Sequence, residues 1–394
     1  MTIEPKTLKG FRDFLPEDAR KRSYVVNALK KVFESYGFEP LETPVLEYEE
    51  VLLGKYGDEG DKLMYKFEDN GGRRVAMRYD QTVPLARVIA QYQNELPLPF
   101  KRYQVSNVWR AENTQKGRFR EFLQCDIDTV GADSVISDSE IIKVVISSLE
   151  SLGIKNFKVL VNDRTIFQNI PKEAIVIVDK LKKNGEESVK EELSEKGIDS
   201  GVLENIRTSK PTERINEVLE ILGDDRIIFE PTLARGLDYY TGLIIEVEVE
   251  GYDGGSVGGG GRYNNLIGMF SRESIPAVGF AFGFDRLLEV LEQQNLLKID
   301  PAVSKVLVTV FSKEFENDSI ETANKLRSRG INTELWLETD SKIEKQLKYA
   351  DKKKIPYVII IGSEEKEKEM VTIKALDTRE QKTVKIEEAI LMLG

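Results

Sequence analysis

Residues 101–131 read KRYQVSNVWRAENTQKGRFREFLQCDIDTVG, the pattern of two long strands joined by a short polar loop. Because successive side chains of a strand point to opposite faces, alternation gathers polar groups on one face. Those groups are Arg110, Glu112, Arg118, Arg120, Gln124, Asp126 and Asp128. Arginine pairs with phosphate and stacks on bases. The stretch therefore predicts either an anion site or a charged sheet face with cross-strand ion pairs.

Two glycine-rich stretches follow later in the chain. Residues 254–270 read GGSVGGGGRYNNLIGMF, and residues 277–291 read AVGFAFGFDRLLEVL. The first favours a sharp bend or the close approach of a ligand, although a flexible hairpin loop has the same composition. The second sets Asp285 and Arg286 at the start of an expected helix, where the N-terminus favours phosphate. A close-packed strand-to-helix junction with an ion pair is the alternative there.

A third unusual stretch, LARGLDYYTG at residues 233–242, comes directly before an apolar strand pattern, LIIEVEVEG. It combines one arginine, one aspartate and two neighbouring tyrosines. A core accommodates fewer polar atoms and a surface carries fewer aromatic rings. We interpret this stretch as part of a ligand site.

The composition limits the chemistry that is available. The chain has 394 residues, no histidine and a single cysteine, Cys125. The usual general base and the usual ligands of soft metals are therefore missing. Catalysis must come from carboxylates, arginines, lysines, tyrosines, backbone groups or a hard metal held by oxygen.

Charge and hydropathy narrow the class of protein. The net charge of −11 argues against a general nucleic-acid binder, whereas six basic residues against one acid within 101–120 indicate a dedicated anion site. No apolar run is long enough to span a bilayer, and the N-terminus lacks the apolar core of a signal peptide. We expect a cytoplasmic protein that does not contact a membrane.

The remaining pattern indicates two or three domains. We expect a helix over 17–36, an extended segment over 38–52, a strand ending near Asp80 with a helix from Val83, and a helix over 138–152. Charged helical pieces in 162–228 indicate an insertion. Beyond a linker around Pro301, strands alternate with helices over 317–330 and 341–351, which predicts a small α/β domain with a largely parallel sheet.

In this order, the features resemble the signature of the class II aminoacyl-tRNA synthetases. The helix over 17–36 and the strand at Pro44 resemble the first motif, which forms the dimer interface in that class. The hairpin at 101–131 resembles the second motif and 277–291 the third. RGLDYYTG and GGRYNNL further resemble the two histidine-site signatures of the histidyl-tRNA synthetase family. The resemblance covers essentially the whole chain.

The resemblance implies a fold and an activity. It implies an α+β catalytic domain with a mostly antiparallel sheet (1–161 and 229–300), a mainly helical insertion (162–228) and a C-terminal α/β anticodon-binding domain (304–394). Members of the family activate L-histidine with ATP to histidyl-adenylate and pass the histidyl group to the 3′ end of the histidine tRNA. Mg²⁺ accompanies ATP, no protein metal site is implied, and the enzyme is a homodimer.

Roles carry over where residues match the family's motifs. The catalytic arginines would be Arg110, Arg235 and Arg286. ATP would contact Arg110, Glu112, Arg118 and Arg286. Histidine would contact Asp80, Gln81, Thr82, Gln124, Asp128, Arg235, Tyr239 and Tyr240. Gln115 would lie in the loop that reaches the tRNA acceptor end. Such pre-positioned arginines stabilise charge on a phosphoryl group without any protein proton transfer.

Three positions depart from the family's pattern. Asp80 stands where many bacterial members have glutamate, Asn264 where aspartate is usual, and Asp285 where glutamate is more typical. We expect all three to be tolerated, with Asn264 on a pocket wall.

Two related functions compete with this interpretation. The regulatory subunit of ATP phosphoribosyltransferase resembles the synthetase core but generally lacks the terminal domain and keeps the arginines poorly. Here Arg110, Arg235 and Arg286 are present and a terminal domain follows. Synthetases for glycine, threonine or proline share the general motifs, but RGLDYYTG argues against them.

Overall fold

The hairpin expected at residues 101–131 forms two neighbouring strands of an eight-stranded sheet. Strands β5 (Phe100–Trp109) and β6 (Glu121–Val130) pair antiparallel, with Phe100 opposite Val130 and Trp109 opposite Glu121. The sheet has the order β1-β5-β6-β11-β10-β9-β7-β8. Both strands begin and end within a few residues of the limits that the alternation predicts.

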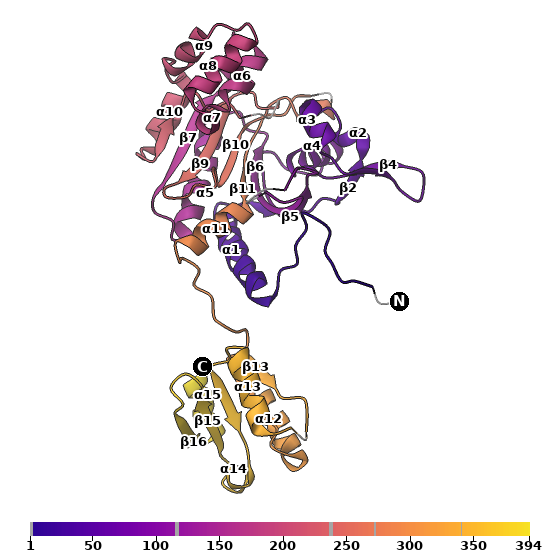
Figure 1. Cartoon of the computed structure of the whole chain (residues 1–394), viewed down its shortest axis with the longest axis vertical. Helices are drawn as coiled ribbons and strands as arrows, with labels where there is room; N and C mark the ends of the chain where they lie inside the picture. The colour runs from indigo at the N-terminus through magenta and orange to yellow at the C-terminus, as the bar shows by residue number, and fades with distance from the viewer. Residues whose placement is uncertain (1–2, 115–117, 236–238, 272, 340) are drawn as a thin grey trace. The chain divides into compact units, whose positions relative to one another are not determined.

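The computed structural model describes residues 3–114, 118–235, 239–271, 273–339 and 341–394 (Figure 1). The chain divides into two compact units, residues 1–297 and 298–394. Each unit has a sheet of its own. Within the described residues, no helix is long and apolar enough to cross a membrane.

The other strands of the large sheet come from distant parts of the chain. Their bounds are β1 Glu39–Pro40, β7 Phe157–Asp163, β8 Ile227–Phe229, β9 Leu243–Val249, β10 Gly258–Arg262 and β11 Ala277–Gly283. Among the described strands of this sheet, only the edge pairs β1–β5 and β7–β8 are parallel. The expected mostly antiparallel sheet is confirmed.

The glycine run at 258–261 forms the buried interior strand β10 rather than a flexible loop. The loop alternative is therefore wrong. A sheet interior usually disfavours glycine, but β10 lies between β9 and β11, which satisfy its backbone hydrogen bonds on both sides.

Four helices cover one face of the large sheet, namely α1 (Pro16–Ser35), α5 (Val135–Ser151), α10 (Glu213–Leu222) and α11 (Phe284–Gln293). Their apolar residues form one core with the odd-numbered residues of β6, Cys125 and Ile127. Burying that stripe leaves the even-numbered residues of β6 on the opposite face.

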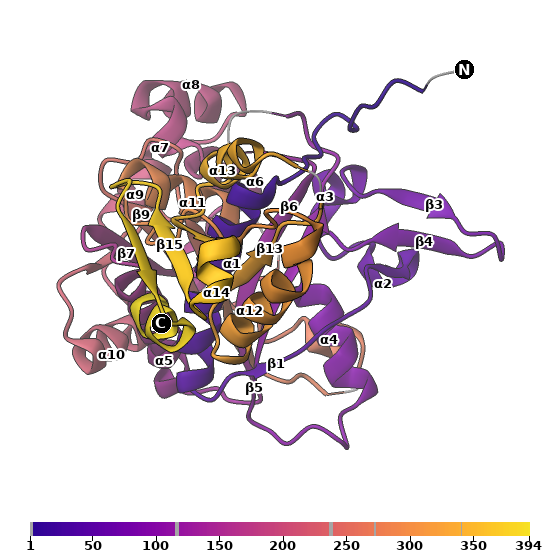
Figure 2. The ribbon, with the colours of Figure 1, turned by 90° about the horizontal axis from the view of Figure 1, so that it is seen from below.

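A small sheet and helix α4 (Thr82–Gln91) lie on that opposite face (Figure 1). The sheet has the order β2 (Leu46–Tyr48), β4 (Arg74–Met77), β3 (Lys66–Glu68), and β3 and β4 project as a ribbon in Figure 2. Two short helices follow β2, α2 (Glu49–Leu52) and α3 (Gly57–Lys62). The extended segment expected to reach residue 52 therefore ends at Tyr48.

Strand β4 ends at Met77, three residues before the expected limit at Asp80. Asp80 instead caps helix α4, because its Oδ1 accepts hydrogen bonds from the backbone N–H of Thr82 (3.2 Å) and Val83 (3.1 Å). A carboxylate at this place satisfies N–H groups that the first turn of a helix leaves unpaired.

The helices of the segment 162–228 pack into two different cores. Helices α6 (Lys172–Val178), α7 (Leu181–Asn184), α8 (Glu186–Glu195) and α9 (Gly201–Arg207) share a small core with Leu160 of β7 and Ile244 of β9. Helix α10 instead buries Ile215 and Val218 in the large core against α5. Strand β8 then returns to the edge of the large sheet.

The second unit contains a five-stranded sheet, in the order β13 (Thr333–Leu335), β12 (Val306–Val308), β14 (Tyr357–Ile360), β15 (Val371–Ala375) and β16 (Gln381–Val384). Its helices are α12 (Glu316–Ser328), α13 (Ile343–Lys352), α14 (Ser363–Glu367) and α15 (Ile386–Leu393). The β13–β12–β14 pairings are parallel as expected. Strands β15 and β16 add two antiparallel pairings, so the prediction of a largely parallel sheet is only half right.

Candidate active site

A pocket with a volume of about 360 Å³ opens on the face of the large sheet that the four helices leave free. The even-numbered residues of β6 form its floor: Phe122, Gln124, Asp126 and Asp128. Neighbouring even positions lie about 7 Å apart along a strand. The floor therefore changes in steps from carboxylates at the Asp128 end to an aromatic ring at the Phe122 end.

The strand beside the floor carries small residues wherever it faces the pocket. On β11, Gly279 lies opposite Asp128, Ala281 opposite Asp126 and Gly283 opposite Gln124. A Cβ added at Gly279 would lie 1.9 Å from Asp128 Oδ1. Glycine is required here because the carboxylate fills the space that any larger side chain would need.

The same argument explains the glycine strand β10. A Cβ added at Gly259 would lie 1.6 Å from Nη1 of Arg235, and one added at Gly260 would lie 2.0 Å from the carbonyl oxygen of Gly279. The group that closely approaches the glycine run is therefore the protein's own arginine, together with the neighbouring backbone.

Three carboxylates converge at one end of the pocket. Asp80, Asp126 and Asp128 are 5%, 2% and 3% exposed. Behind them lies Arg102, which is fully buried and places its Nη2 2.7 Å from Asp128 Oδ2. This acidic end, defined by the three aspartates, is suited to a cationic group of a ligand.

Three tyrosines line the acidic end, and a fourth, Tyr56, contacts Asp80. Tyr239 packs edge-on against Tyr240 and Tyr263, with ring centroids 5.0 and 5.9 Å away. Its hydroxyl donates to Asp80 Oδ2 at 3.4 Å, and the hydroxyl of Tyr263 donates to Asp128 Oδ1. Tyr56 donates to Asp80 Oδ1 at 2.9 Å. Aromatic walls with polar tips are suited to a flat, polar ring.

Burial dominates the electrostatics of the acidic end. It raises the pKa of the Asp80 and Asp128 carboxyls above the usual value, and it raises the pKa of Asp126 much further. The positive charge of Arg102 opposes this shift at Asp126 and Asp128 without cancelling it. Desolvation penalises each negative charge until a cation arrives to balance it.

Arginines converge at the other end of the pocket. Arg110 donates from Nε to the Tyr79 carbonyl at 3.2 Å, and its guanidinium lies 4.3 Å from the Tyr79 ring centroid. Arg286 donates from Nη1 to the Ser256 carbonyl at 2.9 Å. Arg118 lies 3.3 Å from Glu112. Burial lowers the pKa of Arg286 and the nearby charge of Arg118 lowers it further, an arrangement that an anion would relieve.

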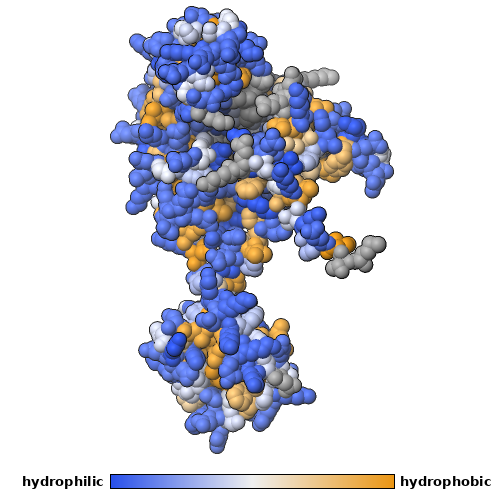
Figure 3. All heavy atoms as spheres, in the orientation of Figure 1, coloured by the Kyte–Doolittle hydropathy of each residue, from blue (hydrophilic) through white to orange (hydrophobic). Residues whose placement is uncertain are grey.

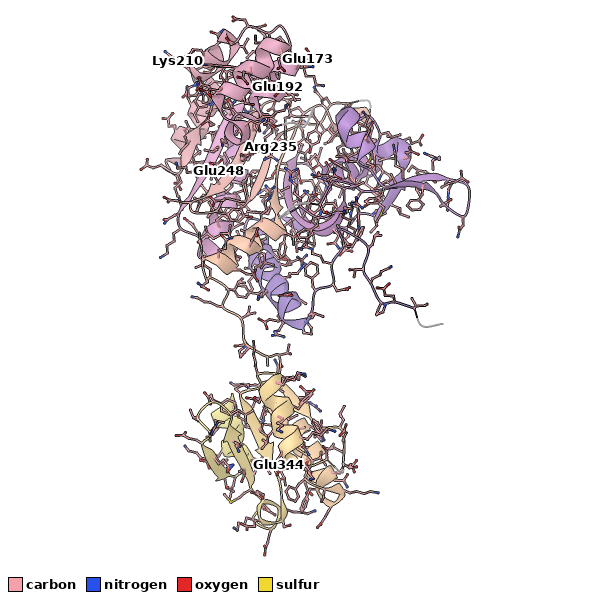
Figure 4. All side chains as sticks on the ribbon, in the orientation of Figure 1. Glu173, Glu192, Lys210, Arg235, Glu248 and Glu344 are labelled. Carbon is pink, nitrogen blue, oxygen red and sulfur yellow. The ribbon has the colours of Figure 1, made fainter. Side chains whose placement is uncertain are left out.

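Arg235 lies beside β9 and β10 (Figure 4). Its Nη1 is 3.1 Å from Glu246 Oε2 on β9, and its Nε is buried without a hydrogen-bond partner among the described residues. Glu246 therefore fixes the direction of the guanidinium while part of its donor capacity stays available to a ligand.

The N-terminal segment supports the arginine end from behind. Asp285, next to Arg286, accepts from Arg12 Nη2 at 2.8 Å and from Arg22 Nη1 at 2.9 Å. Arg12 also covers the ring of Phe119, 3.2 Å from its centroid. These contacts hold the start of α11 against the segment that follows the hairpin loop.

Comparison with known proteins decides the family. The sequence profile of histidyl-tRNA synthetase matches residues 10–220 and 200–287, and that of an anticodon-binding domain matches residues 305–393. The histidine–tRNA ligase of Wolinella succinogenes is 40% identical, and the match covers 100% of this chain and 99% of that protein.

The chain belongs to the histidyl-tRNA synthetase family.

Solved structures agree with this assignment. The histidyl-tRNA synthetase of a Nostoc species superposes with a TM-score of 0.84 at 32% identity, covering 99% of this chain and 100% of that one. A Bacillus halodurans protein described as an ATP phosphoribosyltransferase regulatory subunit/histidyl-tRNA synthetase superposes with a TM-score of 0.72 over 89% of this chain and 97% of that one. At 22% identity, the latter likeness shows the fold alone.

Most of the residues that the synthetase motifs single out meet in the pocket. Those that line it are Asp80, Thr82, Arg110, Glu112, Arg118, Gln124, Asp128, Arg235, Tyr239, Tyr240 and Arg286. They come from segments up to about two hundred residues apart, which the large sheet brings together. Gln115 lies outside the described residues, as do residues 236–238 of the RGLDYYTG signature.

Two predicted positions lie outside the pocket lining. Gln81 is fully buried and donates from Nε2 to the Ser106 carbonyl at 2.9 Å, so its side chain supports the floor from below instead of facing the pocket. Asn264 is likewise not a wall of the pocket. Its Oδ1 accepts from Arg262 Nη1 at 3.3 Å and from the Ala277 N–H at 3.4 Å.

The polar pocket residues that the predicted site left out include Tyr79, Asp126 and Tyr263. The alternation of β6 groups Asp126 with Gln124 and Asp128, and that signal was sufficient to find it. Tyr263 lies within the GGRYNNL signature, whereas Tyr79 has no signal of its own.

The described residues contain no group of three or more cysteine, aspartate or glutamate side chains that could hold a metal ion.

Proposed function

We propose that this chain is a histidine–tRNA ligase that activates L-histidine with ATP and transfers the histidyl group to the histidine tRNA. One observation carries the proposal. This chain belongs to the histidyl-tRNA synthetase family, and its pocket has buried carboxylates and tyrosines at one end and four arginines at the other. Such a pocket can hold a cationic amino acid and a polyphosphate with their reacting groups between the two ends.

The acidic end would bind the amino acid. Asp80 and Thr82 would receive the α-ammonium group, and Gln124 and Asp128 the imidazole nitrogens, with Tyr239 and Tyr240 against the ring. A pocket that hydrogen-bonds both ring nitrogens rejects amino acids without them, because its own buried polar groups would be left unpaired. At this end, Tyr239 donates a hydrogen bond to Asp80 and Tyr263 donates one to Asp128.

The arginine end would bind ATP. Arg110 and Arg286 would hold the α- and γ-phosphates, with Glu112 and Arg118 beside them, and Arg235 would face the α-phosphate. When the histidine carboxylate attacks the α-phosphorus, negative charge builds on the phosphoryl oxygens. Arginines that are already fixed by Glu246 and the Ser256 and Tyr79 carbonyls stabilise that charge with little reorganisation.

Mg²⁺ would enter with ATP, and the residues present fit this role. Magnesium in phosphate sites usually takes one or two carboxylates and several phosphate or water oxygens. Glu112 supplies a carboxylate at the arginine end, where it forms an ion pair with the half-exposed Arg118. There the ion would neutralise phosphate charge.

We further propose that the enzyme works in the cytoplasm as a class II homodimer, with residues 304–394 binding the anticodon. The second unit corresponds to an anticodon-binding profile over residues 305–393. Four apolar side chains in or beside the small sheet are between 41% and 53% exposed: Val45, Leu46, Tyr48 and Phe67. Figure 3 shows orange residues in the region where Figure 1 labels β2 and β4. Adjacent exposed apolar side chains of this kind are typical of subunit interfaces.

Two features of the chain speak against the alternative that it is a regulatory subunit of ATP phosphoribosyltransferase. The arginine end is complete, and the second unit matches an anticodon-binding domain. A subunit that only senses histidine would need neither.

The test is amino-acid-dependent exchange of pyrophosphate into ATP, with each of the twenty amino acids in turn. We expect exchange with histidine alone, because only histidine satisfies the acidic end. Arg235→Ala should lower the exchange rate by at least about 10²–10³-fold, the usual effect of removing one transition-state donor. Folded protein that binds histidine and exchanges with no amino acid would contradict the proposal.

A further inference from the structure

Asp126 is a buried carboxylate that neither the motifs nor the proposed roles use. It lies on the pocket floor between Gln124 and Asp128, opposite Ala281 of β11. Ala281, whose side chain is a single methyl group, also lines the pocket. Asp126 is 2% exposed, and its Oδ1 accepts no hydrogen bond from the described residues.

Its two neighbouring carboxylates are better supplied with donors. Asp80 accepts from Tyr56, Tyr239 and two backbone N–H groups. Asp128 has Arg102 at 2.7 Å and the hydroxyl of Tyr263. A buried acceptor without a donor is destabilising, because it has lost its hydrogen bonds to water without replacing them. Asp126 therefore has the strongest requirement of the three for a donor from a ligand.

The charges around Asp126 do not balance without a ligand. Arg102, Asp128, Asp80 and Arg110 act on it from the pocket, and Arg78 acts from the other side while also facing Glu47 and Glu42. Arg110 would be matched by ATP. When all three carboxyls are ionised, they face the single charge of Arg102, and the α-ammonium of an amino acid supplies one more positive charge. One further positive charge is needed for neutrality.

We propose that Asp126 is a third carboxylate that binds the amino acid, and that the pocket holds the imidazole ring of histidine as the imidazolium, with a proton on each nitrogen. The inference rests on the proposed function and deepens it. Asp126 and Asp128 flank one ring, and two negative charges within a few ångströms stabilise its cationic form. The ring then donates from both nitrogens, so the pocket selects for charge as well as shape.

The absence of histidine from the chain makes a direct measurement possible. With histidine labelled by ¹⁵N in the ring, every imidazole signal in the nuclear magnetic resonance spectrum belongs to the ligand. A free side chain, with a pKa of about 6.5, is neutral at pH 8. We expect bound histidine to show two protonated nitrogens at pH 8 in the wild-type complex. A bound ring with one protonated and one bare nitrogen would overturn the proposal.

Asp126→Asn provides the second measurement. It should weaken histidine binding about 10-fold or more and restore the neutral ring at pH 8, since one opposite charge shifts a pKa by about one to three units. The KM for ATP should stay unchanged. Glu121→Gln, on the same strand but outside the pocket, is the matched control and should change neither. Unchanged histidine affinity in Asp126→Asn would refute the role of Asp126.

Thermal unfolding without histidine separates this role from a structural one. Burial raises the pKa of Asp126, so its contribution to stability is full below the pKa of an unfolded carboxyl, about 3.9, and falls as pH rises above it. Asparagine does not ionise. Asp126→Asn should therefore unfold at a higher temperature than wild type at pH 8, and the difference should shrink towards pH 4. A variant that is less stable at pH 8 would indicate a structural role and overturn the inference.

The proposed function is tested separately by histidine-dependent exchange in the wild-type enzyme. That exchange can succeed while the ring is bound neutral, in which case only the present inference fails.

Discussion

At the scale of single residues, the pocket depends on side chains that are absent as much as on those present. Gly279 leaves room for Asp128, and Gly259 leaves room for Arg235. Each glycine lies within a strand, where a larger residue would ordinarily stabilise the sheet. The glycines therefore weaken these strands but allow charged side chains to lie close to the backbone.

Gly259→Ala tests this placement. The added methyl group would displace the Arg235 guanidinium, because its Cβ would lie 1.6 Å from Nη1. We expect a loss of about 10²-fold in the histidine-dependent exchange rate, the usual result of shifting a catalytic group by roughly 1 Å. Gly268→Ala is the control, since its Cβ would have no atom closer than 3.5 Å. Equal rates for the two variants would show that Arg235 needs no such space.

At the scale of elements, a buried ion network joins two helices to the glycine strand. Asp138 on α5 is fully buried, and its Oδ1 lies 2.6 Å from Arg262 Nη2 at the end of β10. Its Oδ2 lies 2.6 Å from Arg214 Nε on α10. Arg262 is 2% exposed. One carboxylate thus anchors α10 and β10 to the central helix of the covered face.

Asp138→Ala should therefore destabilise the first unit by about 3–5 kcal/mol, because it leaves Arg262 buried without its counter-charge. Glu150→Ala on the same helix removes a partly exposed pair with Arg226 and should cost less than about 1 kcal/mol. Urea unfolding followed by circular dichroism measures both. A small loss in Asp138→Ala would mean that water or Asp133, 3.4 Å from Arg262, replaces the missing charge.

At the scale of the whole molecule, the chain consists of two units that bury separate cores. The second unit packs its apolar residues in two clusters drawn entirely from residues beyond 301. The pocket is lined entirely by residues of the first unit. Activation of the amino acid and contact with the anticodon are therefore expected to be separable.

A chain ending at residue 297 tests this separation. We expect it to keep histidine-dependent pyrophosphate exchange within a few-fold, since every lining residue remains. Its kcat/KM for charging tRNA should fall at least about 10-fold, the equivalent of one lost contact of 1.4 kcal/mol. Loss of exchange in a folded truncated protein would show that the first unit depends on the second.

Local signals in the chain predict much of this fold. Alternation in 101–131 predicts β5 and β6, and helical spacing predicts α1 and α5, because each of these elements buries one complete face. Strands β15 and β16 were missed. β15 has a short alternating pattern that buries Val371 and Ile373 and was overlooked, whereas β16 exposes three of its four residues and has no apolar period. The glycine strand β10 has no strand propensity of its own, and only its two neighbours define it.

For the site, the sequence by itself determined the chemistry: arginines, aspartates and tyrosines in signature order, with no histidine and one cysteine. Tertiary structure alone decided which of them meet. It brought Tyr79 and Tyr263 into the pocket, buried the Gln81 side chain against the Ser106 carbonyl and gave Asn264 a supporting position. The physical reason is that residue type and spacing set what a side chain can do, whereas pairing between distant strands sets which charges share one desolvated space.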